Sequence, residues 1–144
     1  MELPETLYEQ VETLSEKGSE LFDEGQFAQA IEQWSQAQEL LPEPKSDWDA
    51  YTWLNTSIGD AHFQLGEFAL ARQSLFDALN GPDGQASPFV HYRLGQTEVK
   101  LQNTESAKSH LLQAYMLDGE AIFLVEPDGI TYLEVLRQAN LITK

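Results

Sequence analysis

The sequence predicts an all-α fold: a superhelix, or solenoid, of about three stacked helix pairs, with an N-terminal helical extension and C-terminal capping helices. Small and large apolar residues recur at the same offsets from Gly18, Gly59 and Gly95. Within each copy the apolar residues return at steps of three and four, which is the period of one helix face. A single helix pair cannot bury its apolar face, so the repeated copies favour a stack.

The clearest copy of the pattern begins at Gly18. We expect Gly18 and Ala30 to let two antiparallel helices approach closely, and Gly25 to open the turn between them. Leu21 and Trp34 have the size to fill the space beside that close contact. Together these positions predict a helix–turn–helix unit of about 34 residues.

The other elements are placed relative to the three copies. The first helix is predicted over residues 4–24 and its partner over 27–41, and Ser46 or Asp47 is the expected N-cap of the second copy. The third copy departs from the pattern, because Gln102 replaces the turn glycine and Glu98 occupies a large apolar position. Apolar residues expected to cover the last repeat are Ile130, Leu133, Leu136 and Leu141. We expect a single domain, 1–144, with repeats at approximately 11–44, 52–85 and 88–121 and a cap at 122–144.

Acidic residues dominate the composition. The 24 acidic and 8 basic residues give a formal net charge of −16, and residues 1–49 hold 13 of the acids but 2 of the bases. Such a surface repels nucleic acid and anionic lipid and attracts a basic partner over a distance limited by salt. The alternative is that the acidity serves only solubility.

The sequence lacks the residues or segments that several classes of function require. There is no cysteine, and therefore no disulfide, thiol catalysis or Cys-type zinc site. The acidic N-terminus does not resemble a signal peptide, and no run of about 18 apolar residues is present, so we expect a cytoplasmic protein without a membrane partner.

No candidate catalytic, metal or cofactor site emerges from the motifs. The three histidines, His62, His91 and His110, occupy different positions of the repeat, and no two are spaced three or four apart on one helix. His62 falls at a packing position. There is no phosphate-binding loop and no GxSxG nucleophile motif. The carboxylates are abundant, but we expect them to be exposed to solvent. A general acid needs a raised pKa, which a carboxyl group acquires by burial. An enzyme is therefore not expected.

The pattern resembles the tetratricopeptide repeat family. The matching residues of the first copy are Gly18, Leu21, Gly25, Ala30, Trp34, Ala37 and Pro42, and those of the second are Gly59, His62, Gly66, Ala71, Leu75 and Ala78. The resemblance implies a right-handed superhelix that binds proteins without catalysis, mostly through a concave face lined by the first helix of each pair. On that basis the expected partner-binding residues are Glu12, Glu16, Ser19, Phe22, Asp23, Trp53, Thr56, Asp60, Phe63, Phe89, Tyr92 and Gln96.

Two features of this expected surface matter for its partner. Trp53, Phe63, Phe89 and Tyr92 are aromatics on a face predicted to meet solvent, which is typical of binding anchors. The alternative is that the N-terminal extension folds over and buries some of them. One subclass of the family grips the carboxyl tails of heat-shock chaperones with cations at the fifth and ninth repeat positions. Here those positions are Ser15, Ser19, Thr56, Asp60, Tyr92 and Gln96, without a cation, which argues against that function.

A closer likeness covers most of the chain. The run from LLPEPKSDW to HYRLGQ (residues 40–96), followed by AYMLDGEAIF, is similar to small bacterial repeat proteins encoded beside Rhs-type and other polymorphic toxins. These are interpreted as immunity proteins, so the likeness implies that the partner is a basic toxin domain. We expect this chain itself to be a monomer or a weak dimer. The competing hypothesis is a secretion chaperone of the type III translocator class that holds an extended peptide. A plain assembly scaffold or a nucleic-acid-mimicking regulator is a third class.

Overall fold

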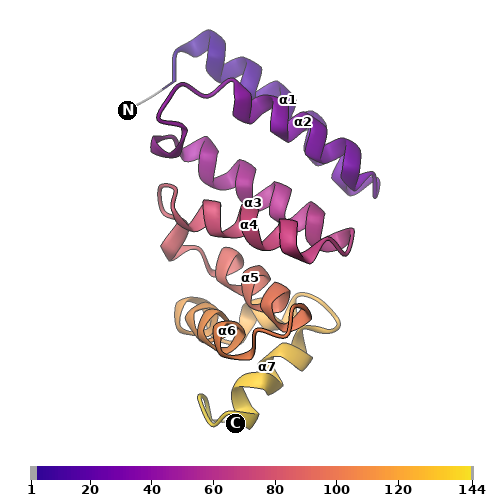
Figure 1. The fold of residues 1–144 in the computed structure, drawn as a ribbon, viewed down its shortest axis with the longest axis vertical. Coiled ribbons are helices and arrows are strands. Elements are labelled where there is room, and N and C mark those ends of the chain that lie inside the picture. The colour runs from indigo at the N-terminus through magenta and orange to yellow at the C-terminus, as the bar shows by residue number, and fades with distance from the viewer. Residues whose placement is uncertain (1–2, 144) are drawn as a thin grey trace. The chain divides into compact units, whose positions relative to one another are not determined.

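The computed structural model describes residues 3–143. Among these residues there are seven α-helices, three short 3-10 helices and no strand, which confirms the predicted all-α class (Figure 1). The α-helices are α1 (Glu5–Asp23), α2 (Phe27–Glu39), α3 (Asp49–Gln64), α4 (Phe68–Leu79), α5 (Pro88–Lys100), α6 (Thr104–Asp118) and α7 (Gly129–Gln138). The 3-10 helices are η1 (Lys45–Asp47), η2 (Gly84–Ala86) and η3 (Ala121–Leu124). No helix in this described part is both long and apolar enough to cross a membrane.

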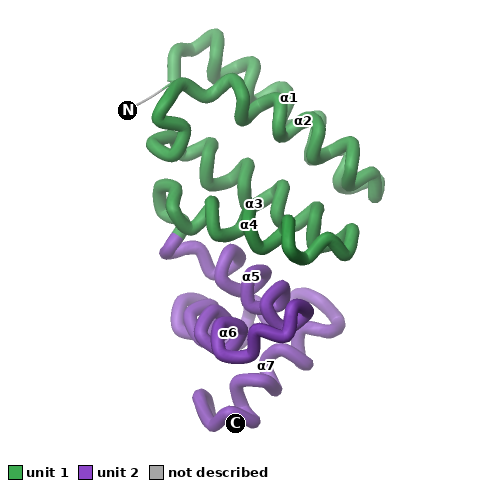
Figure 2. The backbone as a smooth tube through the Cα atoms, viewed as in Figure 1, with its two compact units in different colours: residues 1–84 green, residues 85–144 purple. Residues whose placement is uncertain are grey.

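The chain divides into two compact units, residues 1–84 and residues 85–144 (Figure 2). Unit 1 contains two helix pairs, because α1 packs against α2 and α3 packs against α4, and α2 also packs against α3. Unit 2 contains the third pair, α5 and α6, together with η3 and α7. The three predicted helix–turn–helix copies are therefore all present as antiparallel pairs.

In unit 1 a glycine of the first helix faces a large side chain of the second. A Cβ atom on Gly18 would lie 2.3 Å from the indole nitrogen of Trp34, and one on Gly59 would lie 2.7 Å from Cγ of Leu75. Trp34 is 3% exposed, and its Nε1–H donates to the Ser15 carbonyl at 3.1 Å. The glycines are thus required by the side chains that fill the space above them.

The third repeat departs from the pattern at the two expected positions. Gln102 follows α5 with φ +65°, so a residue with a side chain adopts the left-handed conformation that glycine favours. Glu98 is fully buried, and its carboxylate accepts hydrogen bonds from Asn103 (2.9 Å) and Ser106 (2.5 Å). A buried carboxylate is tolerated where it is hydrogen-bonded, so a polar contact replaces an apolar one between α5 and α6.

The helix start predicted near the second copy is corrected. Ser46 and Asp47 lie in η1, and α3 begins only at Asp49, without a side-chain cap. In unit 2, by contrast, the Ser87 hydroxyl accepts from the Val90 amide at 3.2 Å and caps α5.

The C-terminal cap differs from its prediction at two residues. Leu133 and Leu136 are fully buried as expected, whereas Ile130 is 47% and Leu141 42% exposed. The buried side of α7 is set by Tyr132, Leu133 and Leu136, and Ile130 lies more than a quarter-turn away from that side. Leu141 follows the end of the helix and so belongs to no helix face.

Two residues expected on an exposed surface are buried in unit 2. Tyr92 and Gln96 are each 1% exposed, so the expected exposure is wrong. Tyr92 packs edge-on against Phe123 and Tyr132, with ring centroids 5.1 and 6.5 Å apart. Gln96 accepts a hydrogen bond from the Arg93 guanidinium. The covering segment comes from the C-terminal part of the chain, not from the N-terminal extension.

A bidentate ion pair holds that segment in place. Arg93 is 4% exposed and donates from its two terminal nitrogens to Oε1 and Oε2 of Glu126, at 3.0 and 2.9 Å. This hydrogen bonding lowers the pKa of Glu126 below its ordinary value of 4.5. Burial raises the pKa of the neighbouring Tyr92 to about 12. The carboxylate and the phenol are therefore charged and neutral, respectively, at neutral pH.

The contact at Gly18 gives a direct test of the repeat geometry. In a helix interior, Gly→Ala ordinarily adds about 0.5–1 kcal/mol of stability. At Gly18 the new methyl group would overlap Trp34, so we expect Gly18→Ala to cost about 1–3 kcal/mol instead. Urea unfolding followed by circular dichroism measures it, with the exposed neighbour Ser19→Ala as control. A stabilised Gly18→Ala variant would contradict the close approach.

The Arg93–Glu126 pair predicts a pH dependence for unit 2. Because the folded pKa of Glu126 is lowered, its contribution to stability is complete above about pH 4.5 and is lost as the pH falls through the folded value. We expect Glu126→Gln to cost about 2–3 kcal/mol at pH 7, since it leaves a buried guanidinium without its anion. The difference from wild type should shrink on acidification below pH 4.5.

The control for this prediction is Glu105→Gln. Glu105 pairs with Lys108 at 2.8 Å, but its side chain is 89% exposed. Such surface pairs contribute about 0.2–1 kcal/mol, so this variant should unfold almost like wild type. Equal stability of the Glu126 variant and wild type at pH 7 would show that Arg93 does not depend on this carboxylate.

Candidate protein-binding surface

One side of unit 1 gathers most of the residues predicted to bind a partner. Positions three and four apart share one face of a helix, so the predicted residues of α1 form one row and those of α3 another. We call these two rows the α1/α3 face, which comprises Tyr8, Glu12, Glu16, Ser19 and Asp23 of α1 and Asp49, Trp53, Thr56 and Asp60 of α3. Two pockets, each lined by residues of both rows, join them.

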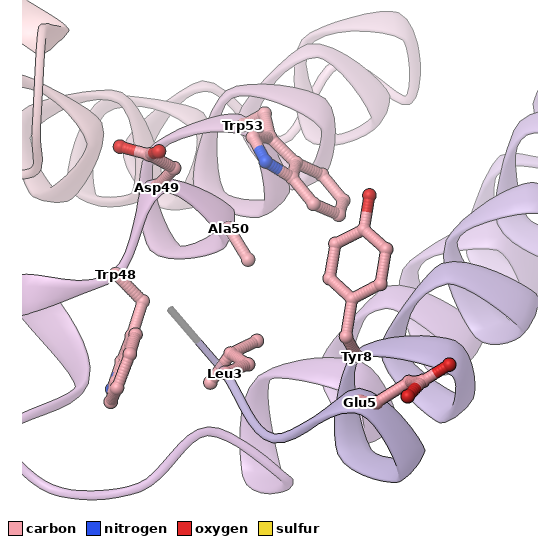
Figure 3. A pocket seen from close by; sticks show the side chains of 7 residues that line it. All are labelled: Leu3, Glu5, Tyr8, Trp48, Asp49, Ala50 and Trp53. Atoms are coloured by element: carbon pink, nitrogen blue, oxygen red, sulfur yellow. The ribbon is translucent and has the colours of Figure 1, made fainter. Parts of the chain in front are cut away.

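The larger pocket lies at the beginning of both helices. It encloses about 570 Å³ and is lined by Leu3, Glu5, Tyr8, Trp48, Asp49, Ala50 and Trp53 (Figure 3). Tyr8 and Trp53 are 48% and 38% exposed. Trp48 is buried instead, and its Nε1–H donates to the Pro42 carbonyl at 2.8 Å. The pocket thus has one fixed aromatic wall and two accessible rings.

The smaller pocket lies at the far ends of the same helices. It encloses about 160 Å³ and is lined by Ser19, Phe22, Asp23, Trp34, Ser57 and Asp60. It brings together four residues that were predicted to bind a partner: Ser19, Phe22, Asp23 and Asp60. Because both pockets draw on the same two helices, α1 and α3 run in the same direction, and Glu12 and Glu16 lie between the pockets along α1.

Three of the predicted residues of unit 1 are held by the chain itself. Phe22 packs edge-on against Phe27, at 4.9 Å between centroids, and Phe63 packs in the same way against Phe68, at 5.4 Å. Both are half-buried, as is Thr56, whose hydroxyl donates to the carbonyl four residues earlier at 2.8 Å. Of the four aromatics predicted to anchor a partner, Trp53 is the exposed one.

In unit 2 the predicted surface is largely closed. Tyr92 and Gln96 are buried under the C-terminal segment, and Phe89 is half-buried, with the Arg93 guanidinium 5.0 Å from its ring centroid. The accessible part of the predicted site is therefore the α1/α3 face of unit 1.

The charge of unit 1 is strongly negative and little compensated on this face. Residues 1–84 include 17 acidic residues, but the basic ones are Lys17, Lys45 and Arg72. Lys45 donates to three carbonyls at the end of α2, at 2.8–3.3 Å, and Arg72 lies 4.7 Å from the centroid of the Phe76 ring. Lys17 follows Tyr8 by nine residues, which turns it to the opposite side of α1.

The Glu12 carboxylate influences one of the exposed rings. The side-chain hydrogen bond to Glu12, aided by the negative charge of that carboxylate, raises the pKa of Tyr8. The phenol therefore remains a donor at neutral pH. This contact links the larger pocket to the acidic row of α1.

The sequence interpretation missed several residues that form the larger pocket, including Tyr8, Trp48 and Asp49. Tyr8 stands one helical turn before Glu12 and could have been found by extending the predicted row by four residues. Trp48 precedes α3, and no spacing within the repeat indicates that it would form a wall.

The structure also brings together two histidines that the sequence separates. Nδ1 of His91 on α5 lies 3.1 Å from Nδ1 of His110 on α6, and Nε2 of His91 donates to the Gln85 carbonyl at 2.9 Å. Nδ1 of a neutral His91 is then an acceptor, so His110 supplies the proton between them. His62 is half-buried and bonds to Glu67 at 2.8 Å. Within residues 3–143, no three His, Asp or Glu side chains gather as a metal site would need.

Comparison with known proteins supports the repeat assignment. Residues 90–120 match the model of the tetratricopeptide repeat, and these residues lie in the third copy, the one that departs most from the expected pattern. No curated protein sequence matches the chain.

Solved structures resemble the chain over nearly its whole length. The first TPR domain of Spaghetti (RPAP3), bound to the HSP90 peptide SRMEEVD, is 22% identical with a TM-score of 0.72, covering 93% of this chain and 95% of that one. The first TPR domain of human RPAP3 is 22% identical with a TM-score of 0.70, covering 92% and 93%. The Arabidopsis OM64 TPR domain is 17% identical with a TM-score of 0.74, covering 92% and 98%. These similarities confirm the predicted fold class, a helix-pair repeat fold of the tetratricopeptide type.

Proposed function

We propose that this chain is a non-catalytic module that binds a basic protein through the α1/α3 face of unit 1. We further propose that it serves as an immunity protein, which neutralises a cognate bacterial toxin domain. The observation that carries the proposal is the combination of two pockets, exposed Tyr8 and Trp53 rings and a row of exposed carboxylates on one face. Aromatic anchors within a polar rim are typical of protein interfaces.

The sign of the charge indicates the kind of partner. The first TPR domain of Spaghetti (RPAP3) is bound to the HSP90 peptide SRMEEVD. The second TPR domain of human RPAP3, which is 15% identical to this chain with a TM-score of 0.71, is in complex with the HSP70 peptide SGPTIEEVD. Both peptides have acidic ends. Here Asp23 and Asp60 line the smaller pocket, and no cation of the described residues lines either pocket. An acidic peptide would be repelled, whereas a basic domain would be attracted and guided during its approach.

The toxin as partner is supported by the likeness of residues 40–96 to proteins encoded beside polymorphic toxins. Many such toxins act on nucleic acids or nucleotides through basic surfaces. A protein with an acidic face can cover such a surface and compete with its anionic substrate. Charge would then determine the rate of association, and Trp53 and its pocket would contribute specificity.

The competing function is a secretion chaperone or assembly scaffold that holds an extended peptide. It is favoured by the peptides bound to the similar RPAP3 domains. The two functions differ in the partner: a folded basic domain across the acidic face, or a short unfolded segment within the pockets.

A capture experiment separates these functions. The immobilised chain is exposed to a lysate of its native host, and bound proteins are identified by mass spectrometry. We expect a basic toxin domain encoded beside the gene, whose activity in vitro is lost when the complex forms. Capture of unfolded secretion substrates alone, or a complex in which the toxin stays active, would contradict the immunity role.

Reversing charge on the face should slow association. We expect Glu12→Lys with Glu16→Lys to lower the association rate constant with the captured partner by about 10–100-fold, because steering raises such rates by 10–1,000-fold. Surface plasmon resonance at two salt concentrations measures it. The matched control is Glu32→Lys with Glu39→Lys on α2, where both residues are exposed but line neither pocket. Equal slowing by both pairs would indicate net charge alone rather than this face.

The tryptophans should separate binding from folding. Trp53 is 38% exposed, so we expect Trp53→Ala to cost about 1–2 kcal/mol of stability but at least tenfold in affinity for the partner. Trp34 is 3% exposed and fills the space at Gly18, so Trp34→Ala should cost about 3–5 kcal/mol. Denaturant unfolding and binding isotherms test both. If Trp53→Ala unfolds the protein, Trp53 is a core residue and not an anchor.

A further inference from the structure

We propose that the larger pocket of unit 1, between Tyr8 and Trp53, receives an arginine side chain of the partner. This inference rests on the proposed binding function and names the chemistry of one contact within it. It assigns a definite occupant to a pocket that the repeat pattern did not predict. The proposal depends on the aromatic rings, the carboxylates and the apolar floor of that pocket.

The two exposed rings supply flat faces for a planar cation. Tyr8 comes from α1 and Trp53 from the first turns of α3, and Figure 3 shows the Tyr8 ring directed toward the indole. Tyr8 is 48% and Trp53 38% exposed, so part of each ring is accessible to a partner. A guanidinium binds such faces through cation–π attraction and stacking, and does so more often than an ammonium.

The rim supplies acceptors for the guanidinium hydrogens. Glu5 and Asp49 line the pocket from opposite helices, and both are exposed. Neither carboxylate is paired with a basic group of the described chain: Lys45 is bound to the end of α2, and Arg72 lies over Phe76. Arginine offers five N–H donors in a fixed plane, which can bond a carboxylate while the same plane rests on a ring.

The floor suits the aliphatic part of the same side chain. Leu3 and Ala50 lie between the two rings and Trp48 in Figure 3, and Trp48 is held in place by its bond to Pro42. Arginine buries its methylene groups on apolar surface while keeping its charged end at a polar rim. The pocket thus matches an arginine along its whole length.

The test uses small probes and the indole N–H signals of the full chain in two-dimensional NMR. The probes are Nα-acetyl-L-arginine amide, the corresponding lysine amide and the neutral norleucine amide. We expect the arginine probe to shift the Trp53 signal and to bind about tenfold more tightly than norleucine, with lysine between them. The Trp34 signal, buried and bonded to Ser15, should not move. Equal binding of arginine and norleucine would overturn the proposal, as would an unchanged Trp53 signal.

Variants that keep the Trp53 signal locate the contact. We expect Tyr8→Leu and Asp49→Asn each to weaken arginine binding by about three- to tenfold and to leave norleucine binding nearly unchanged. Glu32→Gln, which removes one charge from α2, is the matched control and should have no effect. Unchanged signals elsewhere show that each variant is folded. If the control weakens arginine binding as much as Asp49→Asn does, the attraction is general and the pocket assignment is wrong.

The outcomes also distinguish this inference from the proposed function. If the arginine probe does not bind while charge reversal at Glu12 and Glu16 still lowers the association rate constant of the partner, the pocket assignment fails and the binding function stands. If the probe binds at Trp53 but the partner associates independently of those charges, the pocket assignment stands and the proposed function fails.

Discussion

The structure depends on one contact that recurs in each repeat: a glycine of the first helix lies against a large side chain of the second. Gly18 meets Trp34, and in unit 2 a Cβ atom on Gly95 would lie 2.6 Å from Leu111. Because the glycine contributes no side chain at this point, the large side chain of the second helix lies directly against the backbone of the first, and each pair is fixed at close range. In α1 the opposite side is turned away from α2, and exposed residues without a packing role, such as Glu12 and Glu16, lie there.

The α1/α3 face is a consequence of this arrangement. Trp34 occupies the space between α1 and α2, so the side of α1 that carries Glu12 and Glu16 packs against neither the core nor α2. Like charges at helical spacing repel one another by a few tenths of a kcal/mol per pair, and α1 has six acidic residues at such spacing: Glu5, Glu9, Glu12, Glu16, Glu20 and Asp23. The folded chain sustains that cost because its stability comes from the buried contacts, and the field it creates is then available for attracting another molecule.

The sequence was informative where structure depends on local spacing. The helices and their turns follow from residues within one repeat, and so do Ser19, Asp23 and Asp60, which the structure brings together in the smaller pocket. The close approach was expected between Gly18 and Ala30 with Trp34 beside it, whereas Trp34 itself lies over Gly18. The sequence was uninformative where a segment outside the repeats determines which residues are buried. Tyr92 and Gln96 have the spacing of surface residues, but the path of residues 120–132 buries them, and no period in that segment reveals its path. Exposure of Trp53 was predictable from its position, whereas the wall formed by Trp48 was not.

The bidentate pair between Arg93 and Glu126 has a consequence for how recognition can change over evolution. Tyr92 and Gln96 belong to the core of unit 2, so substitutions there are limited by their effect on folding. Residues such as Trp53 and Asp49 in unit 1 carry far less of the core, so they can diverge at small cost. A lineage could therefore acquire new specificities by altering one end of the chain while the other preserves its architecture.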